Sequence, residues 1–163
     1  MAVTKVNHAV LYVRDAAQSA DFYEQALGLE AVHRMGDQAV FMRAAGSTND
    51  HDLGLFGVGG QAGPSPAGRT SVGMYHLAWQ VDTLAELAAT RQRLVELGAL
   101  VGQSDHGASK SLYAHDPDGL EFEVMWQVPT ELHDPDRDAM GTRPLDLDAE
   151  VARFGADTPA RVH

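Results

Sequence analysis

A seven-residue segment near the N-terminus recurs in the middle of the chain. Residues 7–13 read NHAVLYV and residues 75–81 read YHLAWQV, so His8 and His76 occupy equivalent positions. Both segments alternate apolar and polar character and contain β-branched and aromatic residues, which is typical of half-buried β-strands. The repeat therefore predicts two copies of one structural module.

A helix is predicted after each of these two strands. The first begins at Asp15, a suitable N-cap, and ends at Gly28; the second begins at a capping box formed by Thr83 and Glu86 and ends at Gly98. Shorter apolar segments follow each helix: residues 30–33, 39–43 and 52–56 in the first half, and residues 100–103, 111–115 and 121–127 in the second. Each half reads β-α-β-β-β, which predicts an α+β fold.

The length of 163 residues allows one domain or two small modules that share a core. We expect one domain over residues 1–128, followed by a C-terminal tail over residues 129–163 that wraps the surface or a neighbouring subunit. The parts of the domain are module 1 (about 1–57), a Gly-, Pro- and Ser-rich linker (about 58–73) and module 2 (about 74–128). One amphipathic stretch, about 147–154, interrupts the otherwise aperiodic tail.

Composition and charge exclude several classes of protein. Twelve basic and 23 acidic residues give a net charge of −11, which disfavours binding to nucleic acid. The chain lacks the run of about 20 apolar residues that a membrane span requires, and it begins without a secretory signal pattern. The absence of cysteine excludes disulfides and thiolate chemistry. These features fit a cytoplasmic protein, and we also expect a homo-oligomer.

Three potential metal ligands lie on the polar faces of predicted strands. Alternate side chains of a strand point to opposite faces, so His8, His76 and Glu123 each oppose a wholly apolar face. Taken singly, they could be two structural histidines and a surface acid. The equivalence of the two histidines in the repeat favours a site, because two imidazoles and one carboxylate form a facial triad that holds a divalent metal and leaves positions open.

The same repeat aligns Gly54 with Glu123, so the first module offers no side chain at the position of the carboxylate. The metal should then have three protein ligands and room for exogenous ones. Asp52 would become a fourth candidate if the register of its strand slipped by one or two residues.

The stretch from His106 to Glu123 reads HGASKSLYAHDPDGLEFE. This stretch resembles the signature of type I extradiol dioxygenases. The features that match are its first histidine, Tyr113, the Asp-Pro-Asp-Gly turn at residues 116–119 and the final glutamate. Ser104 departs from the residues usual two positions before the histidine. With the paired modules, about residues 4–128 resemble the vicinal oxygen chelate superfamily, which includes glyoxalase I, fosfomycin-resistance enzymes, bleomycin-binding proteins and extradiol dioxygenases. The resemblance implies two βαβββ modules that form an open, metal-binding β-cup.

The resemblance also implies a function in the breakdown of aromatic compounds. A single-domain catechol 2,3-type dioxygenase would hold Fe(II), with Mn(II) as the usual substitute, through His8, His76 and Glu123. It would combine a catechol with O₂ and release a muconic semialdehyde-type product.

Three further residues acquire roles from the resemblance. His106 would serve as the acid–base catalyst, and Tyr113 would donate a hydrogen bond to the substrate oxygen. Residues 51–56, HDLGLF, are similar to a strand that brings another histidine beside the metal in extradiol enzymes, so His51 would stabilise bound oxygen or catecholate. The gap between His51 and His76 is longer than is usual in that family.

Two other functions remain open. A glyoxalase-type isomerase or thiol transferase with Zn(II) or Ni(II) would not need His106 or Tyr113. A metal-free protein that binds an aromatic antibiotic would not need all three ligands. The remaining histidines are predicted to be structural or surface residues: His33, His115, His133 and His163.

Overall fold

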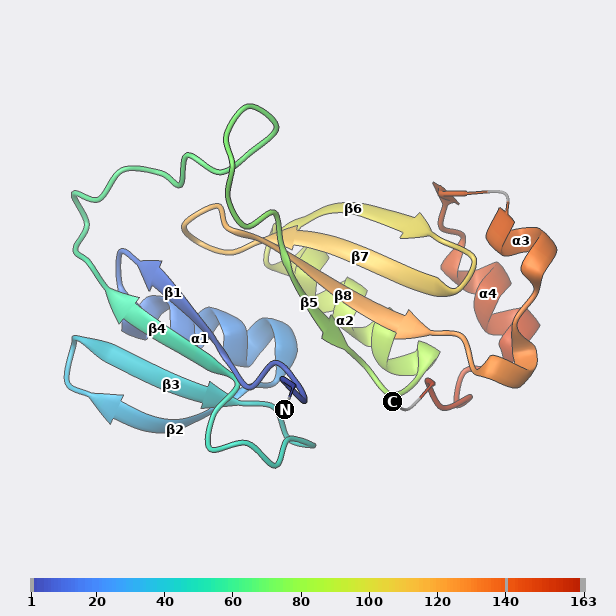
Figure 1. Cartoon of the computed structure of the whole chain (residues 1–163), viewed down its shortest axis with the longest axis horizontal. Helices are drawn as coiled ribbons and strands as arrows, with labels where there is room; N and C mark the ends of the chain where they lie inside the picture. Colours follow the sequence, from blue (N-terminus) through green and yellow to red (C-terminus); the bar gives the residue numbers. More distant parts are fainter. Residues whose placement is uncertain (1, 140, 162–163) are drawn as a thin grey trace. The chain divides into compact units, whose positions relative to one another are not determined.

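The chain folds into two compact units, each built on one copy of the repeat. The structure, a computed structural model, describes residues 2–139 and 141–161 (Figure 1). The first unit comprises the described residues up to Ser65 together with Asp116–Gly119, and the second comprises Pro66–His115 and the described residues from Leu120 onward. Among the described residues, no helix is long and apolar enough to cross a membrane.

A four-stranded sheet and one helix make up the first unit (Figure 1). Its strand order is β1-β4-β3-β2, in which β1 and β4 are parallel and the other neighbours are antiparallel. The elements are β1 (Ala9–Val13), α1 (Ala16–Leu27), β2 (Glu30–Met35), β3 (Ala39–Arg43) and β4 (Leu53–Gly57).

The second unit repeats this arrangement and extends it. Its strand order is β5-β8-β7-β6-β9, with β5 parallel to β8. The elements are β5 (Leu77–Gln80), α2 (Leu84–Glu96), β6 (Leu100–Asp105), β7 (Ser109–His115), β8 (Glu121–Gln127), a 3₁₀ turn (Thr130–Leu132), α3 (Pro135–Ala139), β9 (Arg143–Pro144) and α4 (Leu147–Phe154). The α+β fold and the β-α-β-β-β order predicted for each half are confirmed, and both sheets are open.

The helix ends follow the capping residues of the sequence. Asp15 Oδ1 accepts hydrogen bonds from the backbone N–H of Ala17 and Gln18, and Gly28 ends α1 with φ of 70°. Thr83 and Glu86 form the predicted capping box at the start of α2. These bonds satisfy backbone groups that a helix end otherwise leaves unpaired.

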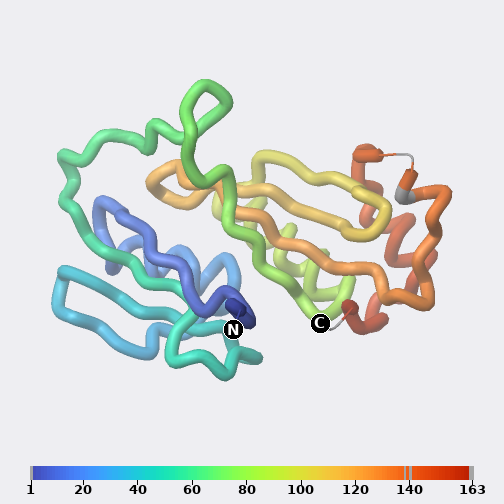
Figure 2. The backbone as a smooth tube through the Cα atoms, viewed as in Figure 1, coloured from blue at the N-terminus to red at the C-terminus, as the bar shows by residue number. Residues whose placement is uncertain are grey.

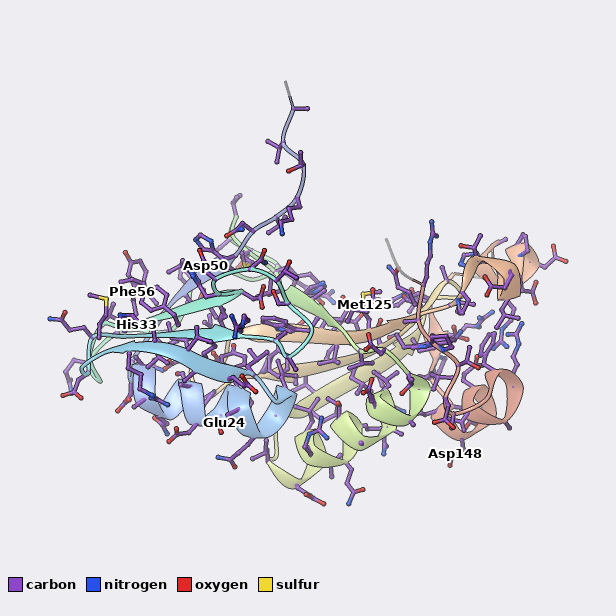
Figure 3. All side chains as sticks on the ribbon, turned by 90° about the horizontal axis from the view of Figure 1, so that it is seen from below. Glu24, His33, Asp50, Phe56, Met125 and Asp148 are labelled. Carbon is purple, nitrogen blue, oxygen red and sulfur yellow. The ribbon has the colours of Figure 1, made fainter. Side chains whose placement is uncertain are left out.

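In each unit the helix covers one face of the sheet and leaves the other for polar and aromatic side chains. Phe122, Val124 and Trp126 of β8 are buried, and they alternate with residues of the opposite face. In Figure 3 the side chain of Met125 lies on the face away from α2. Glu123 shares this face with Met125, because alternate residues of a strand point the same way.

The C-terminal tail packs on the second unit. Strand β9 pairs with β6, the ring of Phe154 lies 5.3 Å from that of Trp126, and Ala160 donates its N–H to the carbonyl of Asp82 at 2.6 Å. Figure 2 shows the last described residues ending near the start of the helix that follows β5. The tail therefore adds a strand and a helix to the second unit.

A buried ion cluster attaches this tail to the hairpin of β6 and β7. Asp105 binds Lys110, whose side chain is fully buried, and it accepts hydrogen bonds from Arg137 at 3.1 Å and Arg143 at 2.8 Å. Glu150 of α4 lies 2.8 Å from Arg137 and 3.3 Å from Lys110. Burial opposes the charge of Asp105, but hydrogen bonds from Lys110, the Gly107 N–H and Arg143 outweigh it and lower its pKa to about 2.

Replacement of Asp105 by Asn should destabilise the protein and alter its acid unfolding. The pKa of Asp105 falls from 3.8 to about 2 on folding. The ionised carboxylate therefore stabilises the fold above about pH 4 by about 2 kcal/mol, and this stabilisation is lost as the pH falls towards 2. Urea unfolding of Asp105→Asn at pH 7 should show at least this loss, and stability should then decline less between pH 4 and 2 than in the wild type.

The matched control is Asp21→Asn, because Asp21 is exposed on α1. It should unfold like the wild type. Equal stability of Asp105→Asn and the wild type at pH 7 would show that the buried cluster does not hold the tail.

Candidate metal centre

His76 and Glu123 lie together in the second unit. The parallel pairing of β5 with β8 sets Ala78 opposite Glu123, and His76 immediately precedes β5. Its Nε2 lies 3.1 Å from Oε2 of Glu123, a residue that is only 8% exposed. His8 and His76 were predicted within their strands, whereas each strand begins one residue later, because ladder pairing starts at Ala9 and Leu77.

The donor atoms of His76 and Glu123 fit a divalent metal. Imidazole with carboxylate suits several first-row divalent metals. Nε2 of His76 and Oε2 of Glu123 are 3.1 Å apart, so both donor atoms are available at one location.

Glu121 is a further acid beside His76 that the sequence reasoning did not single out. Its Oε1 lies 3.9 Å from Nδ1 of His76, and its Oε2 lies 3.5 Å from Nε2 of His115. Nδ1 of His76 is buried and has no hydrogen-bond partner among the described residues. The charge of Glu121 also raises the pKa of Tyr75. The signal was present in the sequence, because Glu121 and Glu123 share one face of their strand.

Tyr113 and His106 extend this group across the neighbouring strand. Tyr113 of β7 lies directly opposite Glu123 of β8, and its ring centroid is 5.9 Å from that of His76. His106 follows β6 in the hairpin loop, and its Nε2 lies 2.8 Å from Oη of Tyr113. Burial and the negative charge of Glu123 raise the pKa of Tyr113 to about 12, so its hydroxyl is neutral at physiological pH.

His8 and His51 form a separate pair in the first unit. Their ring centroids are 4.5 Å apart, and His51 also meets the ring of Phe41 edge-on at 5.0 Å. His8 precedes β1 and His51 lies shortly before β4, so the parallel pairing of these strands brings the two rings together. Nδ1 of His8 lies 2.8 Å from Oδ1 of Asn7.

The register of β4 agrees with the alignment of Gly54 and Glu123. Gly54 lies opposite Val10 in the first unit as Glu123 lies opposite Ala78 in the second. A Cβ atom at Gly54 would lie 3.4 Å from a methyl group of Val10, which is ordinary van der Waals contact.

Asp52 has a local role in the loop before β4. Its carboxylate accepts hydrogen bonds from the Ala44 N–H, the Ser47 hydroxyl and the Asn49 amide at 2.7 to 2.9 Å. Burial opposes its charge, but these hydrogen bonds outweigh that effect and lower its pKa. The strand has not slipped to bring Asp52 to the position of Gly54.

The structure thus groups the predicted site residues by unit. His76, Glu123, Tyr113 and His106 belong to the second unit, and the first contains the pair of histidines near β1 and β4. Within the described part of the chain, no cluster of three or more His, Asp or Glu side chains is arranged to hold a metal ion. Of the other histidines, His33 packs on Phe41, and His163 lies outside the described residues.

The sequence matches the model of the Glyoxalase/Bleomycin resistance protein/Dioxygenase superfamily over residues 5–124. The chain belongs to this superfamily, which is the vicinal oxygen chelate group that its motifs resemble.

Two named dioxygenases are similar to this chain in sequence. The chain is 28% identical over 158 residues to the catechol-2,3-dioxygenase of Bacillus subtilis (strain 168), and the match covers 93% of the chain and 53% of that protein. It is 29% identical over 135 residues to a manganese-dependent 2,3-dihydroxybiphenyl 1,2-dioxygenase of Geobacillus genomosp. 3, with coverage of 77% and 38%. The chain therefore spans about half the length, or less, of these relatives.

Solved structures share the fold. A glyoxalase/dioxygenase from Nostoc punctiforme matches with a TM-score of 0.61 and 22% identity, covering 76% of this chain and 91% of the other. At this identity, the likeness is evidence of the fold alone.

Proposed function

We propose that this chain is an extradiol ring-cleavage dioxygenase. It would insert O₂ into a catechol at one Fe(II) or Mn(II) ion held by His8, His76 and Glu123, and release a muconic semialdehyde-type product. The observation that carries the proposal is a hydrogen-bonded pair beside Glu123: Tyr113 lies directly opposite Glu123 on the neighbouring strand, and His106 contacts Tyr113 from the hairpin loop. The similarity to two named dioxygenases supports it.

Held by His8, His76 and Glu123, the metal would supply the Lewis-acid and one-electron redox chemistry that side chains lack. Imidazole and carboxylate ligands suit both Fe(II) and Mn(II). The similarity to a protein named as manganese-dependent supports keeping Mn(II) as a candidate.

The chain's own residues would bind the substrate and move protons. His106 would take the second phenolic proton of the catechol and later return it to the oxygen released when the O–O bond breaks. Tyr113, which stays protonated, would donate its O–H to the substrate oxygen, and His51 would stabilise bound oxygen or catecholate.

A second candidate is a glyoxalase-type isomerase or thiol transferase, since the matched superfamily includes glyoxalases. That chemistry would use the metal ligands but would leave His106 and Tyr113 without a role. A metal-free protein that binds aromatic antibiotics would leave the contact between His76 and Glu123 unexplained. A cytoplasmic location and a homo-oligomeric state remain predictions from the sequence.

Alanine at any of the three proposed ligands should abolish binding of one divalent ion per chain. Each substitution removes a donor atom that the remaining two cannot replace, while thermal unfolding of the metal-free variants should match that of the wild type. Metal content after gel filtration with Mn(II) or anaerobic Fe(II) measures this directly. His33→Ala is the control, because His33 belongs to the first unit but packs on Phe41.

His8→Ala is the most informative of these variants, because His8 belongs to the first unit and the other two ligands to the second. Stoichiometric binding with unchanged affinity in His8→Ala would remove the first unit from the metal centre.

The metal-loaded protein should consume one O₂ per catechol and form a product that absorbs in the near-visible range.

His106→Gln should keep its metal but lose turnover by about 10²–10⁴-fold, the usual scale for a lost acid–base catalyst. Tyr113→Phe should cost about 1–3 kcal/mol or less, because it removes only a hydrogen bond. An oxygen electrode and a spectrophotometer suffice, with His33→Gln as the control.

Methylglyoxal with a thiol should give no product above background. Isomerisation of the thiol adduct without oxygen uptake would favour the glyoxalase-type function. Full activity of His106→Gln would exclude His106 from the mechanism.

A further inference from the structure

The C-terminal tail reaches the proposed catalytic histidine. Oγ1 of Thr142 lies 3.0 Å from Nδ1 of His106, and Oη of Tyr113 lies 2.8 Å from Nε2 of the same ring. Both ring nitrogens of His106 therefore have a hydroxyl partner, one from the tail and one from β7.

The tail holds Thr142 at this location through its neighbour, Arg143. Strand β9 pairs Arg143 with Asp105, the residue before His106, and the guanidinium of Arg143 lies 2.8 Å from the Asp105 carboxylate. On the other side, the His106 N–H donates to the carbonyl of Ser109 at 2.9 Å. Backbone pairing and a partly buried ion pair thus fix both ends of the Thr142–His106 contact.

A hydroxyl suits this position, because it can donate to or accept from an imidazole nitrogen. Nδ1 can therefore keep its hydrogen bond to Thr142 while Nε2 gains or loses a proton, and the ring does not need to turn between the two states. The partner of one ring nitrogen also governs which nitrogen carries the proton.

We propose that Thr142 is a positioning residue, whose hydroxyl holds the ring of His106 with Nε2 on Tyr113. The tail then contributes a residue that orients the proposed catalytic histidine, although the domain predicted from the sequence ended at residue 128. The role in turnover rests on the proposed dioxygenase function, whereas the orientation of the ring does not.

The orientation is tested first, in the full chain without added metal or substrate. Long-range ¹H–¹⁵N spectra of protein labelled at histidine report the protonation of each ring nitrogen, and His106→Gln assigns the signal. Thr142→Val should shift the Nδ1 resonance of His106, and Thr142→Ser should return it to the wild-type value. An unchanged resonance in Thr142→Val would overturn the proposal.

Kinetics with catechol provide the second readout. Thr142→Val removes one hydrogen bond at an exposed position that water can reach, so kcat should fall by about 3- to 10-fold. KM and metal content should stay within about twofold of the wild type, and Thr142→Ser should recover kcat. The matched control is Thr130→Val, because Thr130 is an exposed threonine of the same tail.

The two proposals fail in different ways. Wild-type kcat in Thr142→Val, or a loss that serine does not recover, would exclude Thr142 as a positioning residue. If the wild type turns over no catechol, the dioxygenase proposal fails, and the nitrogen resonances alone decide how His106 is held.

Discussion

Parallel pairing between the first and last strands of each module is the constraint on which the site depends. Parallel strands need a long crossover, which here consists of one helix and two further strands. In the second unit this pairing sets Ala78 beside Glu123, and thereby brings a histidine two residues before Ala78 into contact with the carboxylate at 3.1 Å. A one-residue slip of β8 would turn Glu123 into the core and break the contact.

The two modules have the same pairing but different side chains at equivalent positions. Phe41 lies opposite Gly54 in the first unit, whereas Tyr113 lies opposite Glu123 in the second. The first sheet therefore offers an aromatic ring and a glycine where the second offers a hydroxyl and a carboxylate. This difference accounts for the polar groups beside His76 in the second unit.

The sequence was sufficient to predict the elements whose signals are local. Period-2 alternation, the Asp15 cap and the capping box at Thr83 predicted the order of elements, and the alignment of Gly54 with Glu123 predicted equivalent registers. The hairpin of β6 and β7 is longer than predicted, because Asp105 pairs with Lys110 beyond the apolar segments. The amphipathic stretch of the tail forms the helix α4.

Contacts between segments far apart in the chain could not be predicted in this way. No local sequence pattern links Thr142 with His106, whose side chains are in contact. The same holds for the ion cluster of Asp105, Lys110 and Glu150. A glutamate on a short amphipathic stretch is typically solvated, and only the structure reveals that Glu150 is buried.

The most direct test of the account is to count the imidazoles bound to the metal. Electron spin-echo envelope modulation of the Mn(II)-loaded protein, with ¹⁴N- and ¹⁵N-labelled histidine, measures the nitrogens coupled to the ion. Two coordinated imidazoles are expected, with one lost in His8→Ala and one lost in His76→Ala. One imidazole or none in the wild type would contradict a metal centre assembled from both modules.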